Sequence, residues 1–285
     1  MEQQPLTNPQ PVNTLQPVPP ASAQPQQHPQ QMVSEQPGVP QEPARPFRIA
    51  AVGDIHVRET DKGKWVDFFR SASQQADVLL LCGDLTDHGY AVEAEVLCEE
   101  MKACTIPVIC VLGNHDHDKN EHQAIRKALV KDTVHFLDGD SIVIGNVGFA
   151  GVKGYGGGFD QYMLSMFGEA ENKAFVQTAV DEALKLESAL SRLDSEHPDV
   201  KKIAIMHYAP IKATVVGEPD AIHPFLGCSR LAEPLNRQNV VACFHGHAHV
   251  GTLEGQTSKG VKVFNVAKPI LQKAGLALPF FLFEV

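Results

Sequence analysis

The chain has 285 residues and a formal net charge of −10, and 43% of its residues are hydrophobic. This acidic balance argues against a general affinity for nucleic acid, and the absence of about 18 consecutive apolar residues argues against a membrane span. The segment Met1 to Pro5 offers neither a basic region nor an apolar stretch of signal length, so we expect a cytoplasmic protein.

The first 46 residues differ in composition from the rest of the chain. They contain 12 prolines and 11 glutamines and show no sustained apolar periodicity. Such a stretch cannot bury enough surface to offset the entropy of ordering it, so we expect a disordered tail over 1–46 and a folded domain over 47–285. Spacings such as Pro17-x-x-Pro20 would let the tail bind an aromatic groove on a protein partner, although they also arise by chance in so proline-rich a stretch.

Short apolar runs alternate with helical patterns in the first part of the domain. A run such as Ile49 to Val52 is too short and too uniformly apolar for an amphipathic helix, and it is typical of a buried strand. The expected order is strand 47–52, helix 65–75, strand 76–81, helix 92–103 and strand 108–112. This alternation predicts parallel strands joined by right-handed crossovers, with ligands bound outside the carboxyl ends of the strands.

The later part changes character and adds a second group of strands. We expect strands over 134–136, 141–144, 147–150, 203–206 and 240–244, with antiparallel closing strands over 261–266 and 280–285. A long helix over 174–193 has an apolar face at Val176, Val180, Ala183, Leu184 and Leu190. Two mixed sheets packed face to face with helices outside bury all these strands, so we expect an α/β fold, a four-layer αββα sandwich.

Seven potential metal ligands follow five of the apolar runs. They are Asp54, His56, Asp84, Asn114, His207, His247 and His249. Burying a carboxylate or an imidazole beside a strand is costly unless it is paired, and several such groups would repel one another unless a cation held them together. The pattern therefore predicts a metal site.

At this point the motifs match a known family. Asp54-x-His56, Gly83-Asp84, Gly113-Asn114-His115-Asp116, the lone His207 and Gly246-His247-x-His249, in this order, resemble the calcineurin-like metallophosphoesterases, in particular the small bacterial phosphodiesterase-type members. Each motif alone is common by chance, but five in the right order at strand ends are specific. The resemblance covers essentially all of 47–285.

The resemblance implies two metal ions with a shared ligand. Asp54, His56 and His249 would hold the first ion. Asn114, His207 and His247 would hold the second, and Asp84 would bridge both. Mixed nitrogen and oxygen ligands suit Mn, Fe or Zn, and the sequence does not choose among them.

The resemblance also implies a mechanism, in which a hydroxide bridging the two ions attacks the phosphoester in line. His115 is the candidate general acid for the leaving alkoxide. Asp87 matches an aspartate that orients this histidine in some relatives, but an aspartate in Thr86-Asp87-His88-Gly89 is also ordinary turn chemistry.

The substrate class is inferred from the absence of two arginines beside the motifs. Protein phosphatases of this superfamily have arginines beside the second and third motifs, where this chain has His88 and Leu112. Fewer fixed cations suit a monoanionic diester better than a dianionic monoester. We therefore expect a phosphodiesterase acting on a small-molecule or nucleotide-type substrate. The alternatives are a phosphomonoesterase or nuclease of the same superfamily, or a catalytically silent scaffold with this fold.

For several other residues the sequence predicts a role less specifically. We expect the glycine-rich loop from Gly154 to Phe159 to be a mobile connection that carries Tyr155 and Phe159 near the substrate entrance, although a plain surface loop fits nearly as well. Arg58 and Lys153 are available as phosphate contacts, but long cations on loops are usually solvated. The six cysteines show no paired two-residue spacing and are expected to be reduced.

Overall fold

The computed structural model describes residues 45–285, so most of the expected tail, residues 1–44, lies outside the described residues. The described part begins at Arg45, whose Nη1 donates a hydrogen bond to Asp77 Oδ2 at 2.9 Å. None of the helices in residues 45–285 combines the length and the apolar character needed to span a membrane.

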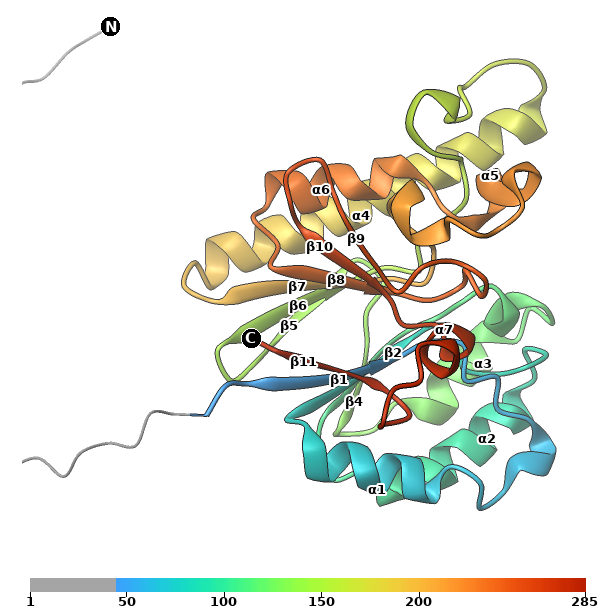
Figure 1. Cartoon of the computed structure of the whole chain (residues 1–285). Coiled ribbons are helices and arrows are strands. Elements are labelled where there is room, and N and C mark those ends of the chain that lie inside the picture. Colours follow the sequence, from blue (N-terminus) through green and yellow to red (C-terminus); the bar gives the residue numbers. More distant parts are fainter. Residues whose placement is uncertain (1–44) are drawn as a thin grey trace, which may run out of the picture. The chain divides into compact units, whose positions relative to one another are not determined.

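The first of two mixed sheets has five strands in the order β11-β1-β2-β3-β4 (Figure 1). Their bounds are β1 (Arg48–Val52), β2 (Val78–Cys82), β3 (Val108–Val111), β4 (Val134–Phe136) and β11 (Phe281–Glu284). Strands β1 to β3 are parallel, as expected, and β4, which was expected with the later group of strands, pairs parallel with β3 in this sheet. Strand β11 closes the sheet antiparallel to β1. The carboxyl ends of β1, β2 and β3 therefore lie along one edge.

The second sheet has six strands in the order β5-β6-β7-β8-β10-β9. Their bounds are β5 (Asp140–Ile144), β6 (Val147–Gly151), β7 (Lys201–Ile205), β8 (Ala242–His245), β9 (Glu254–Gln256) and β10 (Lys262–Asn265). The expectation of an antiparallel closing strand over 261–266 is wrong for its main pairing, because β10 runs parallel to β8 and is antiparallel only to the short β9. The short β9 was not predicted.

Helices cover the outer faces of the two sheets and complete the four layers (Figure 1). On the first sheet lie α1 (Val66–Gln75), α2 (Ala91–Glu100) and α3 (His122–Leu129). On the second lie the long α4 (Ala170–Glu196) and α6 (Ala232–Arg237). The shorter α5 (His223–Leu226) and α7 (Lys268–Lys273) lie in the later connections. The αββα arrangement agrees with the expected fold.

The core follows the two-residue period of the strands. Ile203 and Ile205 of β7 belong to the cluster of buried residues that includes the first sheet, whereas Ala204 belongs to the cluster formed with α4. Alternate residues of a strand point to opposite faces, so β7 packs against the first sheet with one face and against α4 with the other. The sheets thus form a rigid base for the loops at their carboxyl ends.

The apolar face of α4 differs from the expected one at one position. Leu184 is 59% exposed, whereas Ala179, Leu186 and Leu190 are buried. The buried stripe also includes Glu182, whose Oε2 accepts a hydrogen bond from the backbone N–H of Gly154 at 2.8 Å. The other four expected positions are buried or half-buried, so the expected face is confirmed apart from Leu184.

Candidate metal centre

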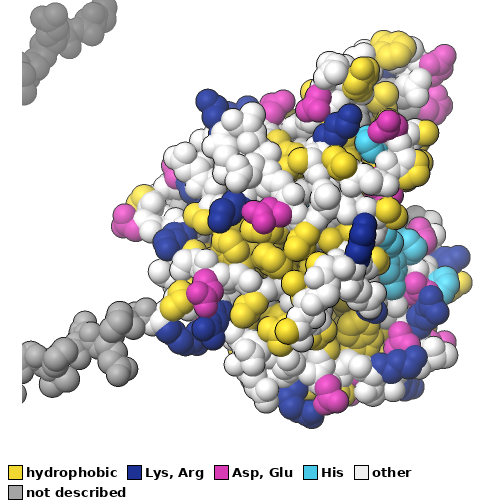
Figure 2. Space-filling model, viewed as in Figure 1, with side chains coloured by type: hydrophobic (Ala, Val, Ile, Leu, Met, Phe, Trp, Pro, Cys, Tyr) yellow, Lys and Arg dark blue, Asp and Glu magenta, His cyan; other side chains and the backbone are white. Residues whose placement is uncertain are grey.

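The seven predicted ligands lie together at the carboxyl ends of five strands. Asp54 and His56 follow β1, Asp84 follows β2 and Asn114 follows β3, all from the first sheet. From the second sheet, His207 follows β7, and His247 and His249 follow β8. Figure 2 shows histidine side chains gathered at one edge of the molecule, between the two sheets. Residues up to 195 positions apart in the chain thus meet at one point.

The backbone at several of these residues adopts the left-handed conformation that L-residues disfavour. The φ angles are 57° at Asp54, 47° at His56, 48° at Asp84 and 71° at His247. Such conformations cost about 1–3 kcal/mol each and persist only where the surroundings enforce them. The concentration of strain at four of the seven positions is typical of a functional site, and strand periodicity gives no sign of it.

Two glycines make the close approach of the loops possible. At Gly83, with φ of 83°, an added Cβ would lie 2.4 Å from His207 Nδ1. At Gly113 it would lie 2.1 Å from Asp84 Oδ1, although the backbone there is not left-handed. Gly83 therefore serves both the turn and the packing, whereas Gly113 leaves room for the carboxylate.

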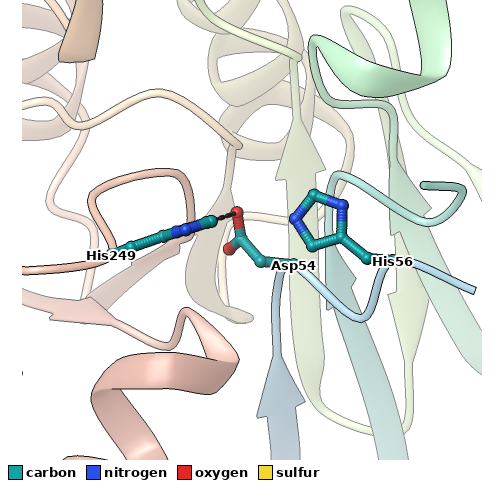
Figure 3. Close-up of side chains that lie close together, drawn as sticks. All are labelled: Asp54, His56 and His249. Carbon is teal, nitrogen blue, oxygen red and sulfur yellow. Dashed lines mark hydrogen bonds and ion pairs between the residues drawn. The ribbon is translucent and has the colours of Figure 1, made fainter. Parts of the chain in front are cut away.

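The first group comprises Asp54, His56 and His249, which point toward one another in Figure 3. His249 Nε2 lies 2.9 Å from Asp54 Oδ1, and one potential ligand atom from each residue lies within 4.8 Å of those of the others. Burial pushes the pKa of Asp54 upward, but the hydrogen bond from His249, nearby histidine charges and the His247 amide outweigh it and lower the pKa to about 2. Asp54 is therefore an anion at neutral pH.

The second group comprises Asp84, His207 and His247. His207 is fully buried, and its Nδ1 lies 3.0 Å from the carbonyl oxygen of Cys82. Because a carbonyl only accepts, the Nδ1 proton is used there. Nε2 lies 2.9 Å from Asn114 Oδ1 and 3.4 Å from Asp84 Oδ1.

These contacts fit a bound cation. Burial lowers the pKa of His207 well below its usual value, so the ring is neutral and its Nε2 carries a lone pair. That lone pair faces oxygen atoms of Asn114 and Asp84, which are acceptors too. Burial, helped by the charges of Asp54 and Asp116, raises the pKa of Asp84 well above its usual value. Converging lone pairs beside a buried carboxylate are the donor set of a metal site.

A backbone carbonyl orients His247 as well. Its Nε2 lies 3.1 Å from the carbonyl oxygen of Phe225, which leaves Nδ1 available to bind a metal ion. Phe225 belongs to α5, which lies between β7 and β8 in the chain. Sequence reasoning missed both orienting carbonyls, at Cys82 and Phe225, because every residue type offers one.

His115 lies beside the cluster with one nitrogen held. Its Nδ1 donates to the backbone carbonyl oxygen of Asp87 at 2.7 Å, and its Nε2 lies 4.0 Å from Asp84 Oδ2. The contact between His115 and Asp87 thus runs through the backbone carbonyl of Asp87 and not through its carboxylate. His115 Nε2 is the ring atom that faces the candidate centre.

The carboxylate of Asp87 is directed to other partners. Its Oδ1 lies 3.4 Å from Nδ1 of His56, and its Oδ2 accepts a hydrogen bond from Arg58 Nε at 2.6 Å. His88 Nδ1 lies 3.3 Å from the same oxygen. Arg58 is therefore paired with Asp87, and the carboxylate borders a candidate ligand instead of the candidate acid.

Asp116 ties the second and third motif loops together. Its Oδ1 accepts hydrogen bonds from the backbone N–H and the hydroxyl of Thr86, and its Oδ2 accepts from the N–H groups of Leu85 and Gly113. This carboxylate is fully buried. Its four bonds hold the loops that carry Asp84 and Asn114.

The glycine-rich segment forms a loop whose two aromatic residues have different surroundings. Tyr155 is half-buried, with its ring 5.8 Å from that of Tyr208, and the Tyr208 ring lies 4.5 Å from that of His247. Phe159 is 3% exposed and packs in a separate apolar cluster. The loop thus brings Tyr155 near the centre. The expectation that Phe159 also lies at the substrate entrance is wrong, because its ring is buried in that cluster.

Comparison with known proteins gives a family and a relative. The model of the family described as calcineurin-like phosphoesterase matches residues 47–251. A protein of Arcobacter nitrofigilis, named probable glycerophosphodiester phosphodiesterase GpdQ, is 24% identical over 214 residues, which is 70% of this chain and 71% of the relative.

A solved structure shares the fold. The phosphopantetheinyl hydrolase PptH from Mycobacterium tuberculosis superposes with a TM-score of 0.62 over 84% of this chain and 96% of that chain, at 13% sequence identity. At this identity the likeness concerns the arrangement of sheets and helices. It agrees with two mixed sheets flanked by helices.

Proposed function

The chain belongs to the calcineurin-like phosphoesterase family and is a metal-dependent phosphoester hydrolase, and from this premise we propose that it hydrolyses small phosphodiesters with the help of two metal ions. The observation that supports two ions is that the potential ligands fall into overlapping groups. Asp54 lies with His56 and His249, and Asp84 lies with His207 and His247. A third group, of His56, Asp84 and His115, joins these two through His56 and Asp84. We assign Asp54, His56 and His249 to one ion. Asn114, His207 and His247 belong to the other, and Asp84 is shared.

The donor set narrows the identity of the metals. Four histidine nitrogens and three side chains with oxygen donors form a mixed set that favours Mn, Fe or Zn over Mg or Ca. When bound, such ions neutralise charge on the phosphate oxygens and lower the pKa of a water molecule. The chain itself fixes the ligands, through the carbonyls that hold His207 and His247 and the amide that holds Asp84.

That amide belongs to His115, to which we assign the proton transfer. Its backbone N–H donates to Asp84 Oδ1 at 2.9 Å, which fixes the residue beside the cluster. With Nδ1 bonded to the Asp87 carbonyl, Nε2 can hold a proton directed toward the site. We propose that Nε2 gives this proton to the departing alkoxide, a step that contributes about 10²–10⁴ in rate.

The charges around the cluster favour a diester over a monoester. Arg58 is engaged by Asp87, and His88 lies 3.0 Å from Glu93 Oε1. Leu112 offers no charge. Lys153 adds one cation near the cluster that has no carboxylate partner among the described residues. A dianionic phosphate would gain more from several fixed cations than from this single group, whereas a monoanionic diester needs fewer. The named activity of the Arcobacter relative supports the same choice.

The test compares a diester with a monoester on one preparation. Mn-reconstituted protein is assayed with bis(4-nitrophenyl) phosphate and with 4-nitrophenyl phosphate, and kcat/KM is measured for each. We expect the diester to be turned over with the higher kcat/KM and both activities to disappear after chelation. A panel with glycerophosphocholine, a cyclic nucleotide and linear DNA then separates small-molecule, nucleotide and nuclease activities.

Two outcomes would count against the proposal. Preference for the monoester would overturn the diester assignment and would favour the phosphomonoesterase alternative. Turnover that persists unchanged after complete removal of metal would overturn the assignment of the seven residues as ligands. A chelated and then Mn-reloaded sample is the matched control, because it has passed through the same treatment.

A further inference from the structure

A lysine stands beside the candidate centre without a carboxylate partner. Lys153 follows β6, whose neighbour β7 leads to His207. Its carbonyl oxygen accepts hydrogen bonds from the backbone N–H groups of His207 and Tyr208 at 3.0 and 3.2 Å. β6 thus contributes a cation to the edge at which five other strands contribute metal ligands.

The ammonium group of Lys153 is held by weak partners. Its Nζ donates to the carbonyl oxygen of Gly154 at 3.1 Å and lies 4.8 and 5.1 Å from the ring centroids of Tyr155 and Tyr208. No carboxylate oxygen in residues 45–285 lies within 4.0 Å of it. Ring faces stabilise a cation but do not neutralise its charge, so a partly buried lysine of this kind is stabilised further by an anion.

The same lysine lines a cavity of about 150 Å³. Leu112 and His117, which flank the third motif, form part of its wall, and α3 and α4 contribute other parts. His117 and His122 stack with ring centroids 4.3 Å apart, and His122 Nδ1 is buried with no hydrogen-bond partner among the described residues. This space accommodates a small polar group but not a nucleoside.

The charges of the cavity wall leave two cations unpaired. Its two carboxylates, Asp138 and Glu182, both bind Lys185, at 3.0 and 2.7 Å from Nζ. Arg126 has its Cζ 5.9 Å from the ring centroid of Phe136 and, within residues 45–285, has no carboxylate oxygen within 4.0 Å. The wall thus carries three cations against two carboxylates, a net positive charge of one, and Lys153 and Arg126 are its cations without a carboxylate oxygen within 4.0 Å among residues 45–285, which makes the cavity suited to an anion.

We propose that this cavity is a subsite for a second anionic group of the substrate, a carboxylate or phosphate carried by one of the two alcohols of the phosphodiester, with Lys153 as its main contact. The proposal rests on the proposed diesterase function. Lys153 is then a specificity-determining residue, because it selects among diesters by a charge remote from the scissile bond.

The test uses three diesters that differ only in the remote group. They are the 2-carboxyethyl, 2-carbamoylethyl and 2-phosphonoethyl esters of 4-nitrophenyl phosphate. The carbamoyl compound matches the carboxylate in shape and lacks its charge, and the phosphonate distinguishes the two kinds of anion. Mn-reconstituted wild-type protein, Lys153→Met, Lys153→Arg and the exposed control Lys173→Met are compared by kcat/KM for each substrate.

We expect wild-type protein to prefer an anionic substrate over the carbamoyl one by about tenfold to hundredfold, the range of one hydrogen bond to a charged group. Lys153→Met should bring this ratio close to one, Lys153→Arg should restore part of it, and Lys173→Met should leave it unchanged. The ratio within one variant is independent of its metal content and folded fraction. A wild-type ratio near one, or a ratio that Lys153→Met leaves unchanged, would overturn the proposal.

A binding measurement separates failure of the subsite from failure of the diesterase assignment. Calorimetry compares 2-carboxyethylphosphonate with propylphosphonate on the same Mn-reconstituted proteins. Tighter binding of the carboxylate compound, lost in Lys153→Met, would support the subsite even if no diester is hydrolysed. Equal affinity of the two phosphonates for wild-type protein would count against the subsite even if diesters are good substrates.

Discussion

Removal of half of the hydrogen-bond capacity of Asp116 should destabilise the protein strongly. In Asp116→Asn the side chain keeps its shape, but one oxygen becomes an NH₂ group. If the remaining oxygen stays with Thr86, the NH₂ faces the N–H groups of Leu85 and Gly113, which are donors too. If the amide turns over, the two donors of Thr86 lose their acceptor instead. Either way two buried donors are left unpaired.

The expected magnitude follows from that count. An unpaired buried donor costs about 1–3 kcal/mol, so the two together lower the free energy of unfolding by about 2–6 kcal/mol. For a domain of this size, about 2–4 °C is lost per kcal/mol, so Tm should fall by roughly 5–20 °C. The bonds involve no metal ligand side chain, and the loss should therefore appear with and without metal.

The assay is urea unfolding followed by circular dichroism, in the presence of Mn and in the presence of a chelator. The exposed Asp132→Asn is the matched control, since it makes the same chemical change at the surface, and it should shift the free energy of unfolding by less than about 0.5 kcal/mol. A loss below about 1 kcal/mol for Asp116→Asn would refute the view that this carboxylate ties the two motif loops together.

Three further changes have defined outcomes. His115→Gln should lower kcat by about 10²–10⁴ with unchanged metal content, and wild-type turnover of the diester would disprove the general-acid role. Leu186→Ala should lower the free energy of unfolding by about 2–5 kcal/mol and Leu184→Ala by less than about 0.5 kcal/mol; equal effects would contradict the observed register of α4. Addition of Mn at about 100 times its Kd to the metal-free protein should raise the free energy of unfolding by about 2.7 kcal/mol, and an unchanged Tm would mean that the folded state binds no metal.

The fold could be predicted largely because its strands are short, apolar and separated by clear turns. The parallel order of β1, β2 and β3 followed from their alternation with helices. The pairing of β10 with β8 could not be predicted, because strand direction in the second sheet depends on which edge is free and not on local pattern. The apolar face of α4 was predicted correctly except at Leu184, and the burial of the charged Glu182 could not be predicted, because its hydrogen bond to the Gly154 amide depends on a distant loop.

The candidate ligands could be predicted because few residue types bind metals and each stands at a strand end. Spacing identifies a residue but not the atom that it uses. Asp87 was chosen by spacing, yet its backbone oxygen contacts His115 and its carboxylate faces His56 and Arg58. The left-handed backbone at His56 and His247 depends on contacts between distant loops, which no local pattern encodes.

The two-metal centre that we propose depends on Asp84 acting as a ligand shared by both ions. Elemental analysis of Mn-reconstituted protein, wild type against Asp84→Asn, measures this directly as ions bound per chain. We predict two ions per chain in the wild type and a clear loss in Asp84→Asn, with the folded state verified by circular dichroism. Fewer than two ions in saturated wild-type protein, or two ions retained by Asp84→Asn, would contradict the shared-ligand centre.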